Sequence, residues 1–272
     1  MRVFVTGATG FIGVSVVREL MNAGHTVIGL ARSDHGAALL KEAGAEVHPG
    51  ALDDLDSLHS GAATSDGVIH LAFQHGSADF AAALTTDLRA VETMGAALEG
   101  SGKPFVTTAH LNGEASDNAV LRLSGVRSSI VTLSPSVHGE GDRHGFVPRL
   151  ITIARTKGVS AYIGDGSNRW PAVHRLDAAH LFRLALEAAP AGSRLYGAGD
   201  EGVPLRAIAD LIGRHLNLPV VSISREEADA HFGSFLSTVV ATDISARLDM
   251  PRLSVQTREL LGWQPVHPRL LP

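Results

Sequence analysis

The chain of 272 residues contains no cysteine, which excludes disulfide bonds, thiolate catalysis, cysteine-ligated zinc and iron–sulfur clusters. It also has no run of 18 apolar residues. Its first residues lead directly into a glycine turn, where a secretory leader would carry an apolar stretch. We therefore expect a cytoplasmic protein that has no membrane partner.

Basic residues are scarce as well. The 23 Lys and Arg against 28 Asp and Glu give a formal net charge of −5, which provides no basic field for nucleic acid. The lysines are Lys41, Lys103 and Lys157, and the two tyrosines are Tyr162 and Tyr196. The 14 histidines form no His-Glu-x-x-His pattern or other pair at ligand spacing, so we expect no metal site.

Apolar residues make up 44% of the chain, which predicts a globular protein with a substantial core. The first half alternates short β-branched runs with amphipathic stretches. The expected strands are Val3–Val5, Val27–Leu30, Val47, Val68–Leu71, Phe105–Thr107 and Ile130–Leu133. The expected helices are Val14–Ala23, Ala37–Ala43 and Phe80–Glu99, followed by Phe146–Thr156, Asp177–Ala189, Leu205–Leu216 and Glu226–Phe232 in the second half.

This alternation predicts an α/β fold with a doubly wound, Rossmann-like parallel sheet. The ligand crevice of such a sheet lies at the carboxyl ends of the strands. After about Gly139 the alternation weakens. We therefore expect a dinucleotide-binding lobe at 1–139 and a small C-terminal α/β substrate lobe at 140–272, which covers the crevice and packs with the first lobe as one compact unit.

A glycine-rich turn, Thr6-Gly7-Ala8-Thr9-Gly10-Phe11-Ile12-Gly13, stands between the first strand and the first helix. In such a turn the first glycine allows the tight bend, the second lets a pyrophosphate approach, and the third lets the helix pack on the strand. The N–H groups and dipole of the helix then hold the phosphate charge. The expected cofactor contacts here are Gly7, Thr9, Gly10, Phe11, Ile12 and Gly13.

The end of the second expected strand indicates which dinucleotide is bound. An acidic residue about 20 residues past the turn would hold the ribose hydroxyl of NAD, but this chain has Arg32 followed by Ser33. A guanidinium suits a 2′-phosphate, and the serine can add a hydrogen bond, so NADP(H) is the expected cofactor. The alternative is a solvated arginine, with Asp34 serving the ribose in an NAD enzyme.

With its extended C-terminal half, this turn resembles the extended and atypical short-chain dehydrogenases/reductases, the NAD(P)-dependent epimerase/dehydratase-like group. Other segments resemble the same family: Gly50–Asp54, Ile69–Phe73, Val137–Gly139, Gly164–Asp177 and Leu260–Pro265. The resemblance implies further cofactor contacts at Leu52, Asp53, Leu71, Ala72, Phe73, Thr107, Pro135, Ser136 and Val137. We interpret His70 as a buried core histidine and the segment Leu260–Pro265 as structural packing.

The proton-transfer pair of that family, a tyrosine followed four residues later by a lysine, is missing. Tyr162 is followed at this spacing by Gly166 and Tyr196 by Asp200. The family's Ser/Thr position is filled by Thr108. Between Thr108 and Val137 only residues 116–123 remain for a helix of about two turns, so any homodimer would need an interface other than the family's usual pairing of long helices.

Two classes of function follow. The first is an NADPH-dependent reductase of a small, largely apolar carbonyl, imine or conjugated substrate, in which Thr108 positions the acceptor oxygen and His138 or His110 is the acid. The second is a protein without redox chemistry, either an isomerase or cyclase or an NADP-binding regulatory protein. The residues expected to contact the substrate are Phe73, Phe146, Trp170 and Val173.

Overall fold

The computed structural model describes residues 1–74, 79–110 and 112–271, which form two compact units. Unit 1 contains Met1–Leu133, Ala178–Leu195 and Thr257–Trp263; unit 2 contains Ser134–Asp177, Tyr196–Gln256 and the described chain from Gln264 onward. The division falls before the predicted boundary at 139 because the strand Ser136–His138 pairs inside unit 2. Two later segments of the chain also return to unit 1.

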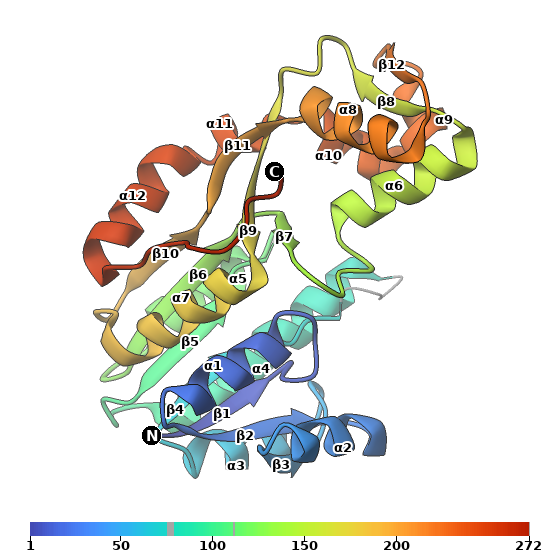
Figure 1. Ribbon diagram of the computed structural model, residues 1–272. Helices are drawn as coiled ribbons and strands as arrows, with labels where there is room; N and C mark the ends of the chain where they lie inside the picture. The colour runs from blue at the N-terminus through green and yellow to red at the C-terminus, as the bar shows by residue number, and fades with distance from the viewer. Residues whose placement is uncertain (75–78, 111, 272) are drawn as a thin grey trace. The chain divides into compact units, whose positions relative to one another are not determined.

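Unit 1 is built on a seven-stranded sheet in the order β10-β6-β5-β4-β1-β2-β3 (Figure 1). The pairs from β6 to β3 are all parallel. The direction of chain progress reverses between β1 and β4, which makes the carboxyl ends of these two strands the topological switch point. The strands are β1 Arg2–Thr6, β2 Thr26–Ala31, β3 Glu46–Pro49, β4 Gly67–His70, β5 Pro104–Thr108, β6 Arg127–Leu133 and β10 Ser193–Gly197.

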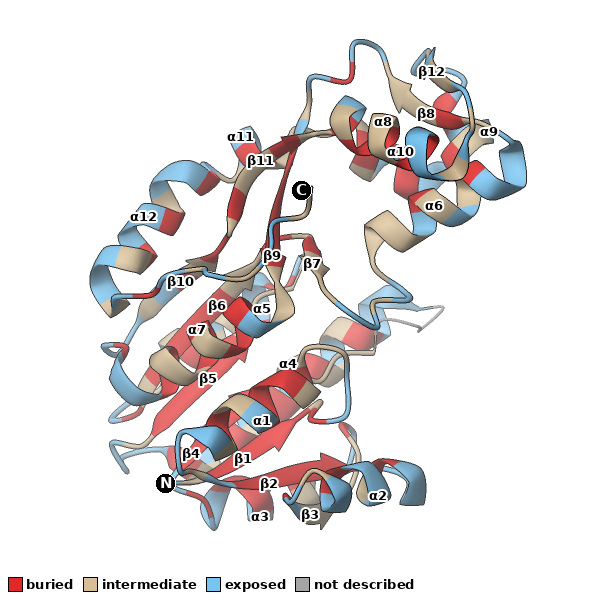
Figure 2. Ribbon diagram, viewed as in Figure 1, coloured by how far each residue is buried: buried red, intermediate tan, exposed pale blue. Residues whose placement is uncertain are grey.

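Helices cover both faces of this sheet, so the predicted doubly wound α/β fold is confirmed. On one face α3 packs against α4 and α4 against α5, while α7 is joined to α1 by an ion pair between Arg183 and Glu19. The helices are α1 Gly13–Asn22, α2 Asp34–Glu42, α3 Leu55–Ala63, α4 Phe80–Leu98, α5 Glu114–Leu121 and α7 Arg175–Ala188. Because β1, β4 and β5 are almost wholly buried, their apolar runs are continuous (Figure 2).

Helix α5 has only eight residues, which is a length of about 12 Å. The short helix expected between Thr108 and Val137 is therefore present, and it begins two residues earlier than predicted. Helix α3 was not predicted. It starts after Asp54, whose side chain accepts a hydrogen bond from the N–H of Ser57 at 3.1 Å and so caps the helix.

Unit 2 is a small α/β assembly, as expected for the second half. Its strands form a three-stranded sheet, β11-β9-β7, and a parallel pair, β12-β8. These strands are β7 Ser136–His138, β8 Ser160–Ile163, β9 Arg169–His174, β11 Asp200–Pro204 and β12 Val220–Ile223. The helices are α6 Phe146–Lys157, α8 Leu205–Leu216, α9 Ala228–Phe232, α10 Ser234–Ala241, α11 Ile244–Arg247 and α12 Met250–Leu261.

The core of unit 2 corrects one part of the sequence analysis. Trp170 was expected to contact a substrate, but it is 0% exposed, and its indole N–H donates to the carbonyl of Val239 at 3.3 Å. Val173, also expected at the substrate, is 0% exposed. Both side chains belong to the packed interior, whereas Phe146, whose ring lies 5.4 Å from that of Trp170, is only half-buried. Across the described ranges, no helix has the length and apolarity needed to cross a membrane.

Candidate active site

The turn between β1 and α1 has the close packing that its glycines predict. Gly7 has a φ of +67°, and a Cβ built on it would lie 2.7 Å from the backbone nitrogen of Ala72 at the end of β4. A Cβ on Gly13 would overlap the carbonyl oxygen of Gly7 and lie 2.9 Å from the Cα of Ala8. The N–H of Gly10 donates to the Gly7 carbonyl at 3.0 Å. Glycine is therefore required at Gly7 and Gly13 for this turn to fit at the switch point.

The N-terminus of α1 is suited to an anion. Its N-cap residue, Ile12, has a side chain that makes no capping hydrogen bond, and the first turn carries no acidic residue. The partial positive charge at this end is therefore not neutralised by the helix's own first turn. Together with the glycine cradle, this fits the pyrophosphate of a dinucleotide.

The end of β2 borders the same turn. Arg32 is exposed, and the Ser33 hydroxyl oxygen accepts the N–H of Gly36 at 3.2 Å, which caps α2. A Cβ on Gly36 would lie 3.5 Å from the Thr9 methyl and 3.4 Å from Ser33 Oγ. The Thr9 methyl and the Ser33 hydroxyl therefore both lie close to Gly36 in the first turn of α2. Among the other predicted contacts in unit 1, Leu52 and Thr107 are buried, Asp53 is exposed, and Phe11, Leu71 and Ala72 are half-buried.

A chain of buried polar groups follows the ends of β1 and β4. The Thr6 hydroxyl lies 2.6 Å from Nδ1 of His70, and Nε2 of His70 lies 3.1 Å from Oδ1 of Asp87 on α4. The other carboxylate oxygen of Asp87 accepts from the Ser116 hydroxyl at 2.6 Å. His70 is 1% exposed, as the interpretation of a core histidine predicts, but its partner is a buried acid.

Asp87 is the charged member of this chain, and it is also 1% exposed. Burial by itself raises the pKa of the Asp87 carboxyl. Hydrogen bonds from His70 and Ser116, with the attraction of His70 and His110, outweigh that effect and lower the pKa below its usual value. The carboxylate is therefore ionised at neutral pH.

His110, expected as an acid, approaches the same carboxylate from the end of β5. Its Nε2 lies 3.7 Å from Oδ1 of Asp87, and its ring stacks on that of Phe73 with centroids 4.2 Å apart. Two residues earlier, the Thr108 hydroxyl donates to the carbonyl of His70 through a long bond of 3.4 Å. The structure thus brings together Thr108, His110 and Phe73 from the sequence analysis and adds Asp87 and Ser116.

The remaining expected residues, Pro135, Ser136, Val137 and His138, belong to unit 2. Ser136 is buried, and its hydroxyl has no hydrogen-bond partner among the described residues. Burial lowers the pKa of His138, although Asp200, Asp142 and Asp177 oppose that effect. The ring of His138 lies 5.4 Å from that of His174.

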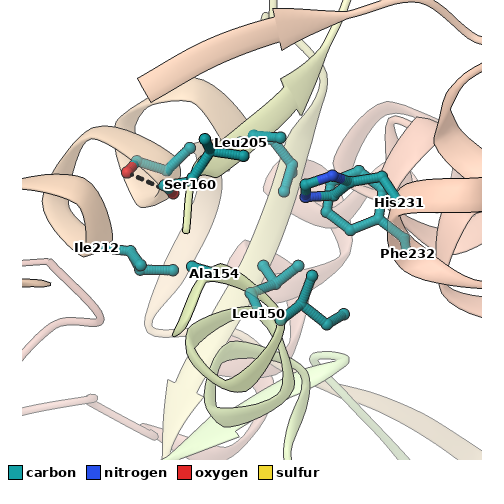
Figure 3. A pocket seen from close by; sticks show the side chains of 11 residues that line it. Leu150, Ala154, Ser160, Leu205, Ile212, His231 and Phe232 are labelled. Atoms are coloured by element: carbon teal, nitrogen blue, oxygen red, sulfur yellow. Dashed lines mark hydrogen bonds between the residues drawn. The ribbon is translucent and has the colours of Figure 1, made fainter. Parts of the chain in front are cut away.

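A small cavity inside unit 2 is a packing defect. Its volume is about 10 Å³, and Figure 3 shows His231 and Phe232 on one side of it, with Leu150 and Ala154 among the aliphatic side chains that line the rest. This volume is at the lower limit for one water molecule, too small for a substrate. Within the described ranges, no group of three or more His, Asp or Glu side chains is arranged to hold a metal ion.

Comparisons with known proteins show what this chain is similar to. The model of the NAD dependent epimerase/dehydratase family matches residues 3–98. An uncharacterised protein of Schizosaccharomyces pombe is 46% identical over 294 residues, covering 100% of this chain and 97% of that relative. The 2-alkyl-3-oxoalkanoate reductase of Stenotrophomonas maltophilia is 27% identical over 257 residues, covering 81% of this chain and 77% of the enzyme.

Among solved structures, the UDP-glucose 4-epimerase of Thermotoga maritima matches with a TM-score of 0.72 and 19% identity, covering 97% of this chain and 94% of the epimerase. At that identity the match supports the fold alone. The family model covers the nucleotide-binding turn and the polar chain as far as Asp87, and the yeast relative extends over the whole chain. On these grounds the chain belongs to the NAD-dependent epimerase/dehydratase family, whose fold binds a nicotinamide cofactor.

Proposed function

We propose that this protein is an NADPH-dependent reductase of a small, largely apolar carbonyl, imine or conjugated substrate. The observation that carries the proposal is the arrangement in unit 1. An intact phosphate turn and a histidine backed by a buried carboxylate stand at the carboxyl edge of one sheet. The reductase relative supports the reaction class.

Cofactor binding is assigned to the turn and to the end of β2. Gly7, Gly10 and Gly13 let the pyrophosphate approach the N-terminus of α1. The exposed Arg32 pairs with the 2′-phosphate, and Ser33 can donate its hydroxyl hydrogen to the same group because its oxygen is the atom used in capping α2. When bound, the nicotinamide supplies the hydride.

The chain's own residues supply the proton and the orientation. Thr108 can rotate its hydroxyl from its long bond with the His70 carbonyl toward the substrate oxygen. His110 is the general acid, since an imidazole exchanges protons near neutral pH. Phe73, stacked on His110, gives the substrate an apolar surface. His138, in unit 2, is the other histidine proposed from the sequence.

A second candidate is a protein that binds the nucleotide without turning over, or a non-redox isomerase or cyclase. The missing Tyr-x-x-x-Lys pair favours it, because that pair lowers the barrier for proton transfer in the family's reductases. The two candidates differ in one observable, the oxidation of NADPH in the presence of a carbonyl compound.

The cofactor is tested by dissociation constants for NADPH and NADH, measured by titration of the wild type, Arg32→Ala and Arg89→Ala. Arg89 is exposed on α4, in the same unit. We expect Arg32→Ala to weaken NADPH binding by about 10-fold to 100-fold, from the loss of a charged hydrogen bond, and to leave NADH binding unchanged. Arg89→Ala should bind NADPH and NADH with the affinities of the wild type. Equal wild-type affinities, or a preference for NADH, would refute the NADP assignment.

A further inference from the structure

We infer that Asp87 is the positioning residue of the site: it fixes the ring of His110 and stabilises the protonated form from which His110 gives up its proton. The inference rests on the proposed function, which makes His110 the acid. The sequence analysis assigned no role to Asp87.

The carboxylate of Asp87 is hydrogen-bonded to one imidazole and lies within ion-pair distance of a second. Its Oδ1 lies 3.1 Å from Nε2 of His70 and 3.7 Å from Nε2 of His110, and its Oδ2 accepts from Ser116 at 2.6 Å. His70 is on β4, Asp87 on α4 and Ser116 on α5. Three elements of unit 1 therefore hold the carboxylate in one orientation, and His110 leaves β5 within reach of it.

The hydrogen bonds of His70 engage both nitrogens of its ring. An ionised Asp87 can only accept, so Nε2 of His70 donates to it. The Thr6 hydroxyl oxygen accepts the N–H groups of Leu71 and Ala72, each at 3.3 Å. The Thr6 hydrogen is then available to Nδ1 of His70 at 2.6 Å, so both ring nitrogens of His70 have partners inside the fold. We therefore assign proton exchange with a substrate to His110, the second imidazole beside the carboxylate.

Burying the charged carboxylate of Asp87 lowers the stability of the fold unless its interactions compensate for the lost hydration. A buried carboxylate loses most of its hydration, whereas an uncharged asparagine side chain could accept the same hydrogen bond from His70. Unlike the amide of an asparagine, the negative charge of Asp87 attracts an imidazolium ring. Hydrogen bonds and attraction from His70, with the hydrogen bond from Ser116, contribute more to the lowered pKa of Asp87 than His110 does. The attraction between Asp87 and His110 is nevertheless mutual, so it also favours the protonated ring of His110.

In the proposed reaction the protonated ring of His110 would give up its proton. Nε2 of His110 faces Asp87, so the proton would leave from Nδ1 on the opposite side of the ring. The N–H bond at Nδ1 would break as an O–H bond forms on the carbonyl oxygen of the substrate, whose carbon would receive the hydride that a bound nicotinamide supplies. His110 becomes neutral, Asp87 stays ionised, and a proton from solvent restores the imidazolium.

The test is a pH titration of the histidine ring carbon-bound protons by NMR, with the His110 resonance identified by its loss in His110→Gln. The titratable groups around the pair are His70 on β4 and, on α5, Asp117, which interacts with Asp87 and with Glu114 of the same helix. We expect Asp87→Asn to move the His110 midpoint to lower pH by about one unit or more, the usual effect of an opposite charge this close. Asp117→Asn, the loss of a partly buried carboxylate that pairs with Arg194, should move that midpoint by much less than Asp87→Asn does.

The inference would be overturned if the His110 midpoint in Asp87→Asn equalled that of the wild type. It would also be overturned if Asp117→Asn shifted the His110 midpoint as much as Asp87→Asn does. If Asp87→Asn does not fold, the wild type provides a second readout. The Asp87 carboxyl carbon resonance should show an inflection at the His110 midpoint, and His110→Gln should remove it. Its absence in the wild type would also overturn the inference. These measurements need no substrate, so failure of the proposed reductase activity remains a separate result.

Discussion

Replacing Gly13 by alanine is the sharpest perturbation of the phosphate turn, because the new methyl group meets only backbone. It would overlap the carbonyl oxygen of Gly7 and lie 2.8 Å from the carbonyl carbon of Gly7. Non-bonded carbons approach to about 3.5 Å, so the turn and α1 must separate by at least roughly 0.7 Å. Neither backbone can rotate away as a side chain could.

A shift of this size displaces the N–H groups that would hold the pyrophosphate. Misplacement by about 1 Å can cost a site ~100-fold, and we expect the NADPH dissociation constant of Gly13→Ala to rise at least tenfold. The assay is NADPH titration alongside a thermal melt. Gly95→Ala is the control, since its methyl would meet the flexible side chain of Leu123 in the same unit. An unchanged dissociation constant in a folded Gly13→Ala protein would refute this account of the turn.

Two further predictions concern the rest of the chain. Tyr162, which lies on β8 under the guanidinium of Arg206, takes no part in the proposed chemistry, so Tyr162→Phe should retain turnover; loss of turnover would place the acid on a tyrosine. Burial and the neighbouring His138 and His267 lower the pKa of His174, so the unfolded chain binds the extra proton and the protein loses stability as pH falls below about 6.5. The decrease in Tm between pH 7.5 and pH 5.5 should be smaller in His174→Asn, and an equal decrease would contradict this.

The central strands of the unit 1 sheet were predictable because they are buried on both faces and because the turn glycines have a fixed physical role. The edge strand β10, which is only partly buried, was missed. Helix α3 was missed because its signal is the Asp54 cap more than a strong apolar face. Much of unit 2 was also missed, since short strands such as β8 and β12 are only partly buried and lack a distinct pattern.

The candidate site was predictable only in part. The strand-end positions of Thr108 and His110 follow from the order of strands. The role of Asp87 does not, because its partners come from β4, from the segment after β5 and from α5. A signal was present, however: Asp87 lies in register with the buried Ala83, Val91 and Met94 of α4, where an acid needs a partner. Trp170 shows the opposite error, an aromatic residue assigned to a ligand that instead fills the core.

The central claim is that this chain reduces a carbonyl compound with His110 as the acid. The most direct test is NADPH oxidation over a panel of apolar ketones, imines and enones, by the wild type and His110→Gln. We predict substrate-dependent oxidation by the wild type and a rate about 100-fold lower in the variant, the usual contribution of general acid catalysis. NADPH binding without oxidation of any panel member, or equal rates in the two proteins, would contradict the claim.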